Sequence, residues 1–181
     1  SGTYDYQEGE MRQYCRSTHA HNVLQIDGVE QCDVWSRFRM GYRGWPKPAQ
    51  AGTNGDVSWC RTTHNAYRRL GVPEVGRWIG CQSKGDWVCV DWAKGRGEHQ
   101  LTHWLHLHPD VGGRLLTPAS VELTVGELRC ELRFLTDGKL TLEQAWYCPE
   151  FGKRIASPLL NWTTRATLPG IVAWVLSWSC V

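Results

Sequence analysis

The sequence predicts an all-β fold, an antiparallel β-sandwich. Strand-like segments alternate with turn dipeptides such as Asp27-Gly28, Asp137-Gly138 and Pro169-Gly170, and turn signals at regular spacing are typical of sandwiches and barrels. No window keeps a helical period over three turns. The chain has 181 residues, of which 41% are apolar, so it can bury a substantial core. We therefore expect one domain over residues 1–181.

The chain up to residue 108 contains three clear strand signals. Residues 21–26 predict a strand that leads into the tight Asp27-Gly28 turn. Residues 87–92 and 99–108 alternate in the manner of half-buried strands. Between the first and second of these segments, residues 44–55 are rich in Gly, Pro and Ala, and we expect a long loop there.

The second half predicts two hairpins. Residues 128–134 alternate apolar with charged side chains, as a strand with one solvated face does. The Asp137-Gly138 turn then leads into residues 140–142, which predicts the clearest hairpin of the sequence. A proline–glycine turn joins residues 162–168 to residues 171–178 and predicts the second.

Charge and motifs exclude several functions. The net charge is only +2 and no Lys/Arg run occurs, which argues against a nucleic-acid partner. The longest apolar stretch, 171–178, is far shorter than the roughly 20 residues of a membrane span, so we expect no membrane insertion. Nucleophile elbows, phosphate loops and dinucleotide fingerprints are missing. Glu8 and Glu10 lie on one local segment, whereas a glycosidase needs carboxylates that face each other across a cleft.

The cysteines are even in number but widely spaced. Without a C-x-x-C pair, cysteine alone gives little support for a zinc site. We favour buried thiols over disulfides, although one or two bridges remain open if the protein is exported. The eight residues are Cys15, Cys32, Cys60, Cys81, Cys89, Cys130, Cys148 and Cys180.

Tryptophan is abundant, with eleven residues in the chain. In a β-rich protein some of these rings pack in the core, and others stack on flat partners such as sugar faces. Composition alone favours the core.

A few polar residues are candidates for a site. His19 and His21 are two apart, so on a strand they would share one face, either as a metal or substrate edge or as ordinary surface and structural histidines. Arg37 beside Phe38 suits recognition of an acidic glycan, but it equally fits a solvated strand face. His64 either lines a cleft or packs locally. The residue types leave these alternatives open.

Three segments carry a resemblance to a known family. The first contains Gly2-Thr3-Tyr4, then Arg-Ser-Thr-His-Ala-His-Asn-Val at 16–23, then Asp27-Gly28 and Gln31. The second covers 64–72 together with Arg77-Trp78, and the third comprises 97–99, 105–111 and 146–152. In this order they resemble the heparinase II/III-like proteins. Val23 stands where that family usually has Thr or Ser, and Asn65-Ala66 replaces the more usual Asp-Gly.

The resemblance implies that the chain is the C-terminal β-sandwich part of a larger polysaccharide lyase. An N-terminal α/α toroid and the first sandwich strands would precede it, with the active site in the cleft between the two parts. The implied reaction is β-elimination at a uronic acid. The catalytic residues are expected on the missing N-terminal part, so the fragment alone is expected to be inactive.

The family pattern also implies roles for individual residues. His21 is the implied metal ligand, and zinc is the expected ion of the parent enzyme, with an incomplete site in this chain. The expected substrate-binding residues are Tyr4 and Asn22, together with Arg37 and His64, which their residue types and positions suggest independently of the family. The expected partners are an acidic polysaccharide and the toroid of the same polypeptide. The resemblance points to the periplasm or to secretion, and the chain itself shows no signal peptide.

A second hypothesis belongs to a different functional class. The chain could be a non-catalytic carbohydrate-binding or structural β-sandwich of exopolysaccharide metabolism. Exposed Trp and Arg clusters without a cleft near His21 would favour it. A sheet with an unpaired edge would in addition allow the fragment to self-associate.

Overall fold

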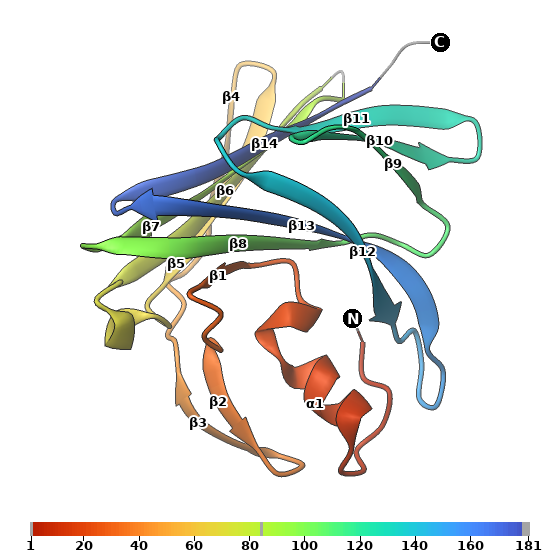
Figure 1. The fold of residues 1–181 in the computed structure, drawn as a ribbon. Helices are drawn as coiled ribbons and strands as arrows, with labels where there is room; N and C mark the ends of the chain where they lie inside the picture. Colours follow the sequence, from red (N-terminus) through yellow and green to blue (C-terminus); the bar gives the residue numbers. More distant parts are fainter. Residues whose placement is uncertain (1, 84, 179–181) are drawn as a thin grey trace.

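The computed structural model describes residues 2–83 and 85–178, and nearly every regular element among them is an antiparallel strand (Figure 1). The predicted antiparallel β-sandwich is confirmed. The helical elements are α1 (Glu10–Arg16), η1 (Thr18–Ala20) and η2 (Arg68–Leu70). The strands are β1 (Leu24–Ile26), β2 (Cys32–Trp35), β3 (Arg39–Arg43), β4 (Gln50–Asn54), β5 (Val57–His64), β6 (Glu74–Gln82), β7 (Trp87–Lys94), β8 (Glu98–His106), β9 (Gly112–Thr117), β10 (Ser120–Val125), β11 (Leu128–Phe134), β12 (Lys139–Tyr147), β13 (Ile155–Thr167) and β14 (Gly170–Trp178).

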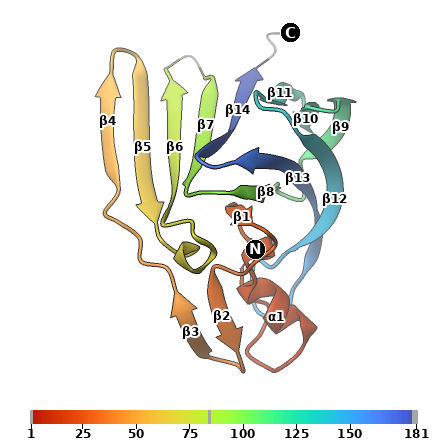
Figure 2. The same ribbon diagram turned by 60° about the vertical axis from the view of Figure 1, so that its left-hand side comes forward.

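Two sheets make up the sandwich. Within the described residues the larger sheet has eight strands in the order β4-β5-β6-β7-β14-β11-β10-β9, and the smaller has four in the order β1-β8-β13-β12. The strands β2 and β3 pair only with each other. In Figure 2, β4 to β7 stand side by side as one layer, and β8 and β13 run across the molecule as part of the second.

The hydrophobic core lies between these sheets. Phe134 of the larger sheet stacks on Trp162 of the smaller sheet, with ring centroids 4.3 Å apart and planes at 4°. Leu101 and Leu160 on the smaller sheet and Val172 on the larger sheet are fully buried around them. Burying one such side chain stabilises the fold by about 1.5–3 kcal/mol. The stacked pair of Phe134 and Trp162 and the side chains around it therefore hold the two sheets face to face.

Both predicted hairpins are wrong, although their strands are present. Residues 128–134 form β11, but β11 pairs with β10 and β14, whereas β12 pairs with β13. Likewise β13 lies in the smaller sheet and β14 in the larger. In each case the turn carries the chain from one sheet to the other. The apolar faces of the two strands therefore meet across the core and not within one sheet.

The expected loop at 44–55 contains a strand. Residues 50–54 form β4, which pairs with β5 at the edge of the larger sheet. Gly52, at its centre, lies under the ring of Trp59, and a Cβ at this position would approach that ring to 3.1 Å. The stabilising contact comes from the neighbouring strand, so the local sequence of β4 carries no strand signal.

Below the two sheets, α1 packs beside the β2–β3 hairpin (Figure 1). The side chain of Arg16 donates from Nη1 to the Ser36 carbonyl at 2.6 Å and from Nη2 to the Arg39 carbonyl at 2.9 Å. Arg12 donates from Nη2 to the Arg37 carbonyl at 2.7 Å. Since α1 has only seven residues and is too short to be stable alone, these bonds to the hairpin help to hold it in place.

Replacing Arg16 with Ala is expected to loosen α1 by about 1–2 kcal/mol, because two hydrogen bonds from a charged donor are lost at a partly solvated site. Amide hydrogen exchange of residues 10–16 relative to the core strands measures this effect. Arg165, whose surface pair with Glu98 is mostly exposed, provides the matched control, and its Ala variant should leave α1 unchanged. Equal exchange of α1 in the two variants would contradict the assignment.

The described cysteines are free thiols, and Cys15, Cys89 and Cys148 are buried as expected, whereas Cys60 is exposed; Cys180 lies outside the described residues. The Sγ atoms of Cys15 and Cys148 are 3.9 Å apart in a buried contact between α1 and the segment that follows β12. Burial raises the pKa of Cys148 to about 11, so this thiol stays protonated at neutral pH. Among the described residues, no helix is long and apolar enough to cross a membrane.

Candidate functional site

A cavity of about 210 Å³ opens where the loop before β1 meets β5, β6 and β7. It brings together two of the predicted substrate-binding residues, Asn22 and His64, which are far apart in the sequence. The residues that line it are Asn22, Val23, Leu24, Gln31, Thr62, His64, Val75, Gly76, Arg77 and Asp91.

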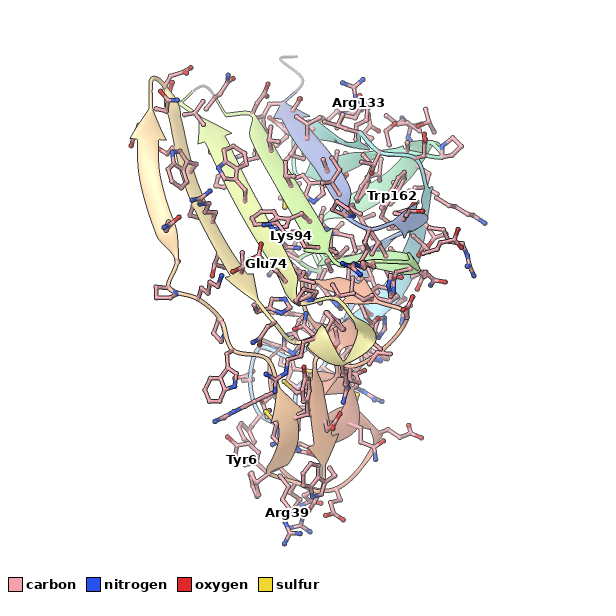
Figure 3. All side chains as sticks on the ribbon, turned by 90° about the vertical axis from the view of Figure 1, so that its left-hand side faces the viewer. Tyr6, Arg39, Glu74, Lys94, Arg133 and Trp162 are labelled. Atoms are coloured by element: carbon pink, nitrogen blue, oxygen red, sulfur yellow. The ribbon has the colours of Figure 1, made fainter. Side chains whose placement is uncertain are left out.

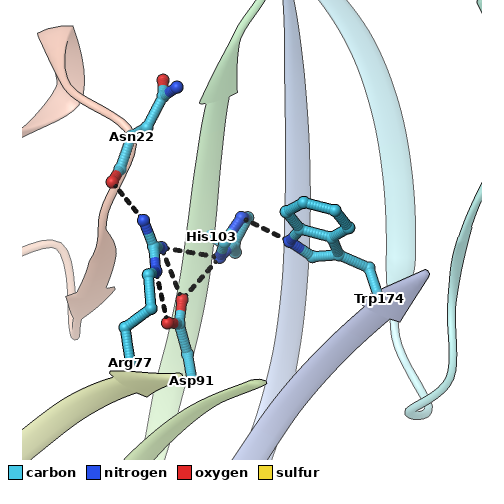
Figure 4. Close-up of polar contacts among 5 residues, drawn as sticks. All are labelled: Asn22, Arg77, Asp91, His103 and Trp174. Atoms are coloured by element: carbon cyan, nitrogen blue, oxygen red, sulfur yellow. Dashed lines mark hydrogen bonds and ion pairs between the residues drawn. The ribbon is translucent and has the colours of Figure 1, made fainter. Parts of the chain in front are cut away.

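A buried ion pair forms the polar wall of this cavity (Figure 4). Arg77 on β6 donates from Nε to Asp91 Oδ1 at 2.6 Å and from Nη2 to Asp91 Oδ2 at 2.7 Å. Asp91 on β7 is 1% exposed. Burial alone would raise the pKa of Asp91, but the hydrogen bonds from Arg77 and His103 outweigh it and lower the pKa to about 2. The pair therefore stays charged at neutral pH.

His103 on β8 extends the ion pair into the core. Its Nδ1 lies 2.8 Å from Asp91 Oδ2, and Trp174 donates from Nε1 to His103 Nε2 at 3.1 Å (Figure 4). An indole N–H can only donate, so His103 Nε2 accepts and the ring proton lies on Nδ1, facing the carboxylate. This chain of bonds from Arg77 to Trp174 links both sheets and holds the guanidinium rigidly.

Asn22 connects the cavity to the smaller sheet. Its backbone carbonyl accepts a bond from Arg77 Nη1 at 2.7 Å, and its side-chain Oδ1 accepts from the backbone N–H of His106 at 2.7 Å. The preceding turn is fixed as well, because the buried Thr18 accepts at Oγ1 from the Gln31 N–H at 2.9 Å. The position of Asn22 is thus determined by three separate segments of the chain.

His64 closes the cavity at the end of β5. Its Nδ1 accepts a hydrogen bond from the Ala66 N–H at 3.2 Å, which leaves the ring proton on Nε2. Burial lowers the pKa of His64, while Asp91 raises it and Arg77 lowers it. The ring is therefore neutral at neutral pH and can act as a hydrogen-bond donor through Nε2.

Sequence and structure comparisons identify the family. A family model described as heparinase II/III-like, C-terminal, matches residues 1–170. The chain belongs to the heparinase II/III-like family. No curated protein sequence matches it at a significant level.

Solved structures share the fold of this heparinase II/III-like chain. The heparan sulfate lyase HepC from Pedobacter heparinus superposes with a TM-score of 0.77 at 15% identity, over 99% of this chain and 28% of that one. A heparinase III, the BT4657 gene product, gives a TM-score of 0.73 at 16% identity over 99% and 27%. A further heparinase III gives 0.66 at 12% identity over 93% and 24%. The chain thus spans about a quarter of the length of these structures.

The predicted histidine pair is arranged differently from expectation. His19 lies in the 3₁₀ turn η1 and His21 follows it, so they do not share a strand face, because this segment curls around the buried Thr18. His21 donates from Nε2 to the Cys15 carbonyl at 3.2 Å, and partial desolvation lowers its pKa. Over residues 2–83 and 85–178, no group of three or more His, Cys, Asp or Glu side chains is placed to hold a metal ion. The described residues therefore do not complete a zinc site around His21.

The other predicted substrate residues lie outside the cavity of this family member. The carbonyl of Tyr4 accepts a bond from the Gly152 N–H at 2.8 Å, which ties the N-terminal segment to the loop before β13. Arg37 lies in the exposed turn of the β2–β3 hairpin, 3.9 Å from Glu8. The structure thus brings Asn22 and His64 together but not Tyr4 or Arg37.

Sequence reasoning missed the central residues Arg77, Asp91 and His103, although a signal was present. In β7, Asp91 lies two residues from both Cys89 and Ala93, which are buried, so the three side chains share one face of the strand. Asp91 is therefore a charged residue on a buried face. A buried carboxylate requires a partner, and this requirement points to another charged or polar residue on the inner faces of the sandwich.

Proposed function

We propose that this chain is the C-terminal part of a polysaccharide lyase that cleaves uronic-acid-containing glycans by β-elimination, and that it forms one wall of the substrate cleft. Its membership of the heparinase II/III-like family supports the reaction class. The observation that carries the proposal is the cavity in which Asn22, His64 and Arg77 meet.

The reaction requires neutralisation of the uronate carboxylate. A base removes the C5 proton, the C4–O4 bond breaks, a C4=C5 double bond forms, and an acid protonates the departing O4. A fixed positive donor beside the carboxylate stabilises the enolate-like charge that develops. Arg77 lines the cavity, and its bonds to Asp91 and Asn22 use three of the five guanidinium N–H groups. Nη2 also lies 3.5 Å from His103 Nδ1, so the second N–H of Nη1 is the group that can bind a carboxylate.

His64 would complete this binding wall through its Nε2–H, which can donate to a glycan oxygen. We place the proton-transferring base and acid on the portion of the lyase that this chain does not span. In the parent enzyme His21 would supply one zinc ligand next to the cleft, and the remaining ligands would come from beyond the described residues. We also propose export to the periplasm or beyond, where such glycans are encountered.

The test uses the full polypeptide that carries this chain, incubated with heparan sulfate, alginate or polyglucuronate while the absorbance of unsaturated uronate is followed. One of these glycans is expected to give rising absorbance. His21→Ala and His64→Ala are expected to lower the rate roughly 10–100-fold, by loss of metal support and of a substrate contact respectively. The zinc content should fall in His21→Ala alone.

His108 provides the control because it is a histidine outside the cavity, with a side chain that is 56% exposed. His108→Ala should retain full rate and full zinc content. Flat traces on every uronate, together with retained glycan binding, would contradict the lyase. That result would instead support the non-catalytic carbohydrate-binding function.

A further inference from the structure

The outer face of the larger sheet carries aromatic rings that the candidate site does not use. Side chains alternate along a strand, and Arg77 and Asp91 point inward, so Trp78 and Trp92, which directly follow them, point outward. Trp59 on β5 shares this outward face through its register with β6. We call these rings of Trp59, Trp78 and Trp92 the tryptophan row.

Glycine residues allow these rings to lie against the backbone. A Cβ on Gly76 would overlap ring atoms of Trp92, and a Cβ on Gly80 would overlap ring atoms of Trp78. The ring of Trp59 packs on a glycine of β4 in the same way. The sheet therefore covers one side of each ring, while the three side chains remain partly exposed.

The tryptophan row runs diagonally across three neighbouring strands. In the register, Trp59 lies opposite Gly80, two residues from Trp78, and Trp92 lies opposite Gly76, two residues further along β6. With a strand spacing of about 4.8 Å and a rise of about 3.4 Å per residue, neighbouring Cα atoms of the row are about 8 Å apart. Such a line of flat surfaces fits a linear ligand with repeating units better than a single compact molecule.

Polar contacts hold one end of the row. Trp92 donates from Nε1 to Glu74 Oε1 at 3.2 Å, and Lys94 Nζ lies 2.7 Å from the same oxygen. Lys47 Nζ lies 3.4 Å from Glu74 Oε2. Hydrogen bonds from Lys94 and Trp92 lower the pKa of Glu74 to about 2, so the carboxylate stays charged and keeps the indole oriented.

A hollow of about 500 Å³ lies beside this end of the row, and we call it the basic hollow. Its lining residues are Lys47, Pro48, Gln50, Arg61, Thr62, Thr63, Glu74 and Lys94. Figure 3 shows Glu74 and Lys94 together on the β6 and β7 strands. Lys47, Arg61 and Lys94 supply more positive charge than Glu74 neutralises, so the hollow favours an anionic ligand.

We propose that the outer face of the larger sheet is a second glycan-binding site, in which a linear anionic polysaccharide stacks on the tryptophan row and places its acidic groups in the basic hollow. A pyranose ring has an apolar C–H face that packs on an indole, while its carboxylate or sulfate groups pair with lysine and arginine. Sites for protein partners are depleted of charged residues at their centre. Here the side chains of Lys47 and Lys94 are 72% and 62% exposed, which favours a glycan.

This second site lies on the opposite side of the sheet from the cavity that contains Arg77 and Asp91. It would hold long chains near the cleft without taking part in the chemistry. Binding at the tryptophan row therefore does not depend on turnover, and the two proposals can fail separately.

Affinity electrophoresis of the full polypeptide through gels that contain heparan sulfate, alginate or neutral dextran tests the proposal. The double variant Trp59→Ala and Trp92→Ala is expected to bind an acidic polysaccharide roughly tenfold more weakly. Trp87 provides the matched control, because it lies on the inner face of β7 and is 42% exposed. Trp87→Ala should bind like the unmodified protein.

A second variant, Lys47→Gln with Lys94→Gln, changes only exposed side chains and so leaves folding intact. It should weaken binding to heparan sulfate and alginate and leave the mobility in dextran unchanged. The unmodified polypeptide could show no lyase activity while the tryptophan variant still loses retention in the gel. That result would support the second site and contradict the proposed function.

Two results would overturn the second site. One is unchanged affinity in the tryptophan and lysine variants. The other is protection of Trp59 and Trp92 from indole oxidation in the full polypeptide without glycan, because protein would then cover this face.

Discussion

Replacing Asp91 with Asn is expected to lower the free energy of unfolding by about 3 kcal/mol at pH 7. The substitution keeps the shape of the side chain but leaves the guanidinium of Arg77 without its counter-charge in the interior. Removing one partner of a buried ion pair costs about 3–5 kcal/mol. The Arg77 side chain is 25% exposed, so water relieves part of this penalty and the lower end of the range applies.

Urea unfolding at pH 7 measures the change, with Glu98→Gln as the matched control. Glu98 also pairs with an arginine, Arg165, but both side chains are more than half exposed. Exposed pairs contribute about 0–1 kcal/mol, so this control should unfold almost like the unmodified protein. A loss in Asp91→Asn no larger than that of the control would show that the Arg77 contact does not stabilise the fold.

Alternation within a strand was enough to predict several strands of this sandwich but not their partners. Residues 128–134 alternate and form β11, while residues 171–178, predicted as a strand from their continuous apolar stretch, belong to β14. The turn dipeptides that follow or precede them suggested hairpins. Yet both turns cross between sheets, since Phe134 packs on Trp162 across the core. A local turn signal does not say in which sheet the next strand lies.

The candidate site could be predicted only in part for a similar reason. Asn22 and His64 were among the expected substrate-binding residues, and the fold places both at one cavity. Arg77 and Asp91 were missed because their pairing depends on the register between β6 and β7, which places them directly opposite each other. Arg37, by contrast, is on a hairpin turn whose position is set by contacts with α1. Such tertiary contacts leave no local pattern.

Replacing His106 with Gln is expected to make the fold less sensitive to acid. His106 donates from Nε2 to the His19 carbonyl at 2.7 Å, and its Nδ1 is buried without a hydrogen-bond partner among the described residues. Burial lowers the pKa of His106 to about 4, against the ordinary value of 6.5, although the bond to His19 opposes the shift. Gln can keep the donor to the carbonyl and cannot titrate.

The direction of the change in stability with pH follows from proton binding at His106. Between pH 6.5 and about 4 the unfolded chain binds a proton at His106 and the folded chain does not, so the stability from the neutral ring is complete above pH 6.5 and is lost as the pH falls. After allowance for partial exposure of the ring, the loss amounts to about 2 kcal/mol.

Urea unfolding at pH 7 and pH 4.5 gives the test. The unmodified protein should lose about 2 kcal/mol more between these two pH values than His106→Gln. His108→Gln removes a histidine whose side chain is 56% exposed, and it should retain the full acid sensitivity. Equal acid sensitivity in His106→Gln and the unmodified protein would mean that the folded chain accommodates a charged His106 and that Nδ1 reaches solvent.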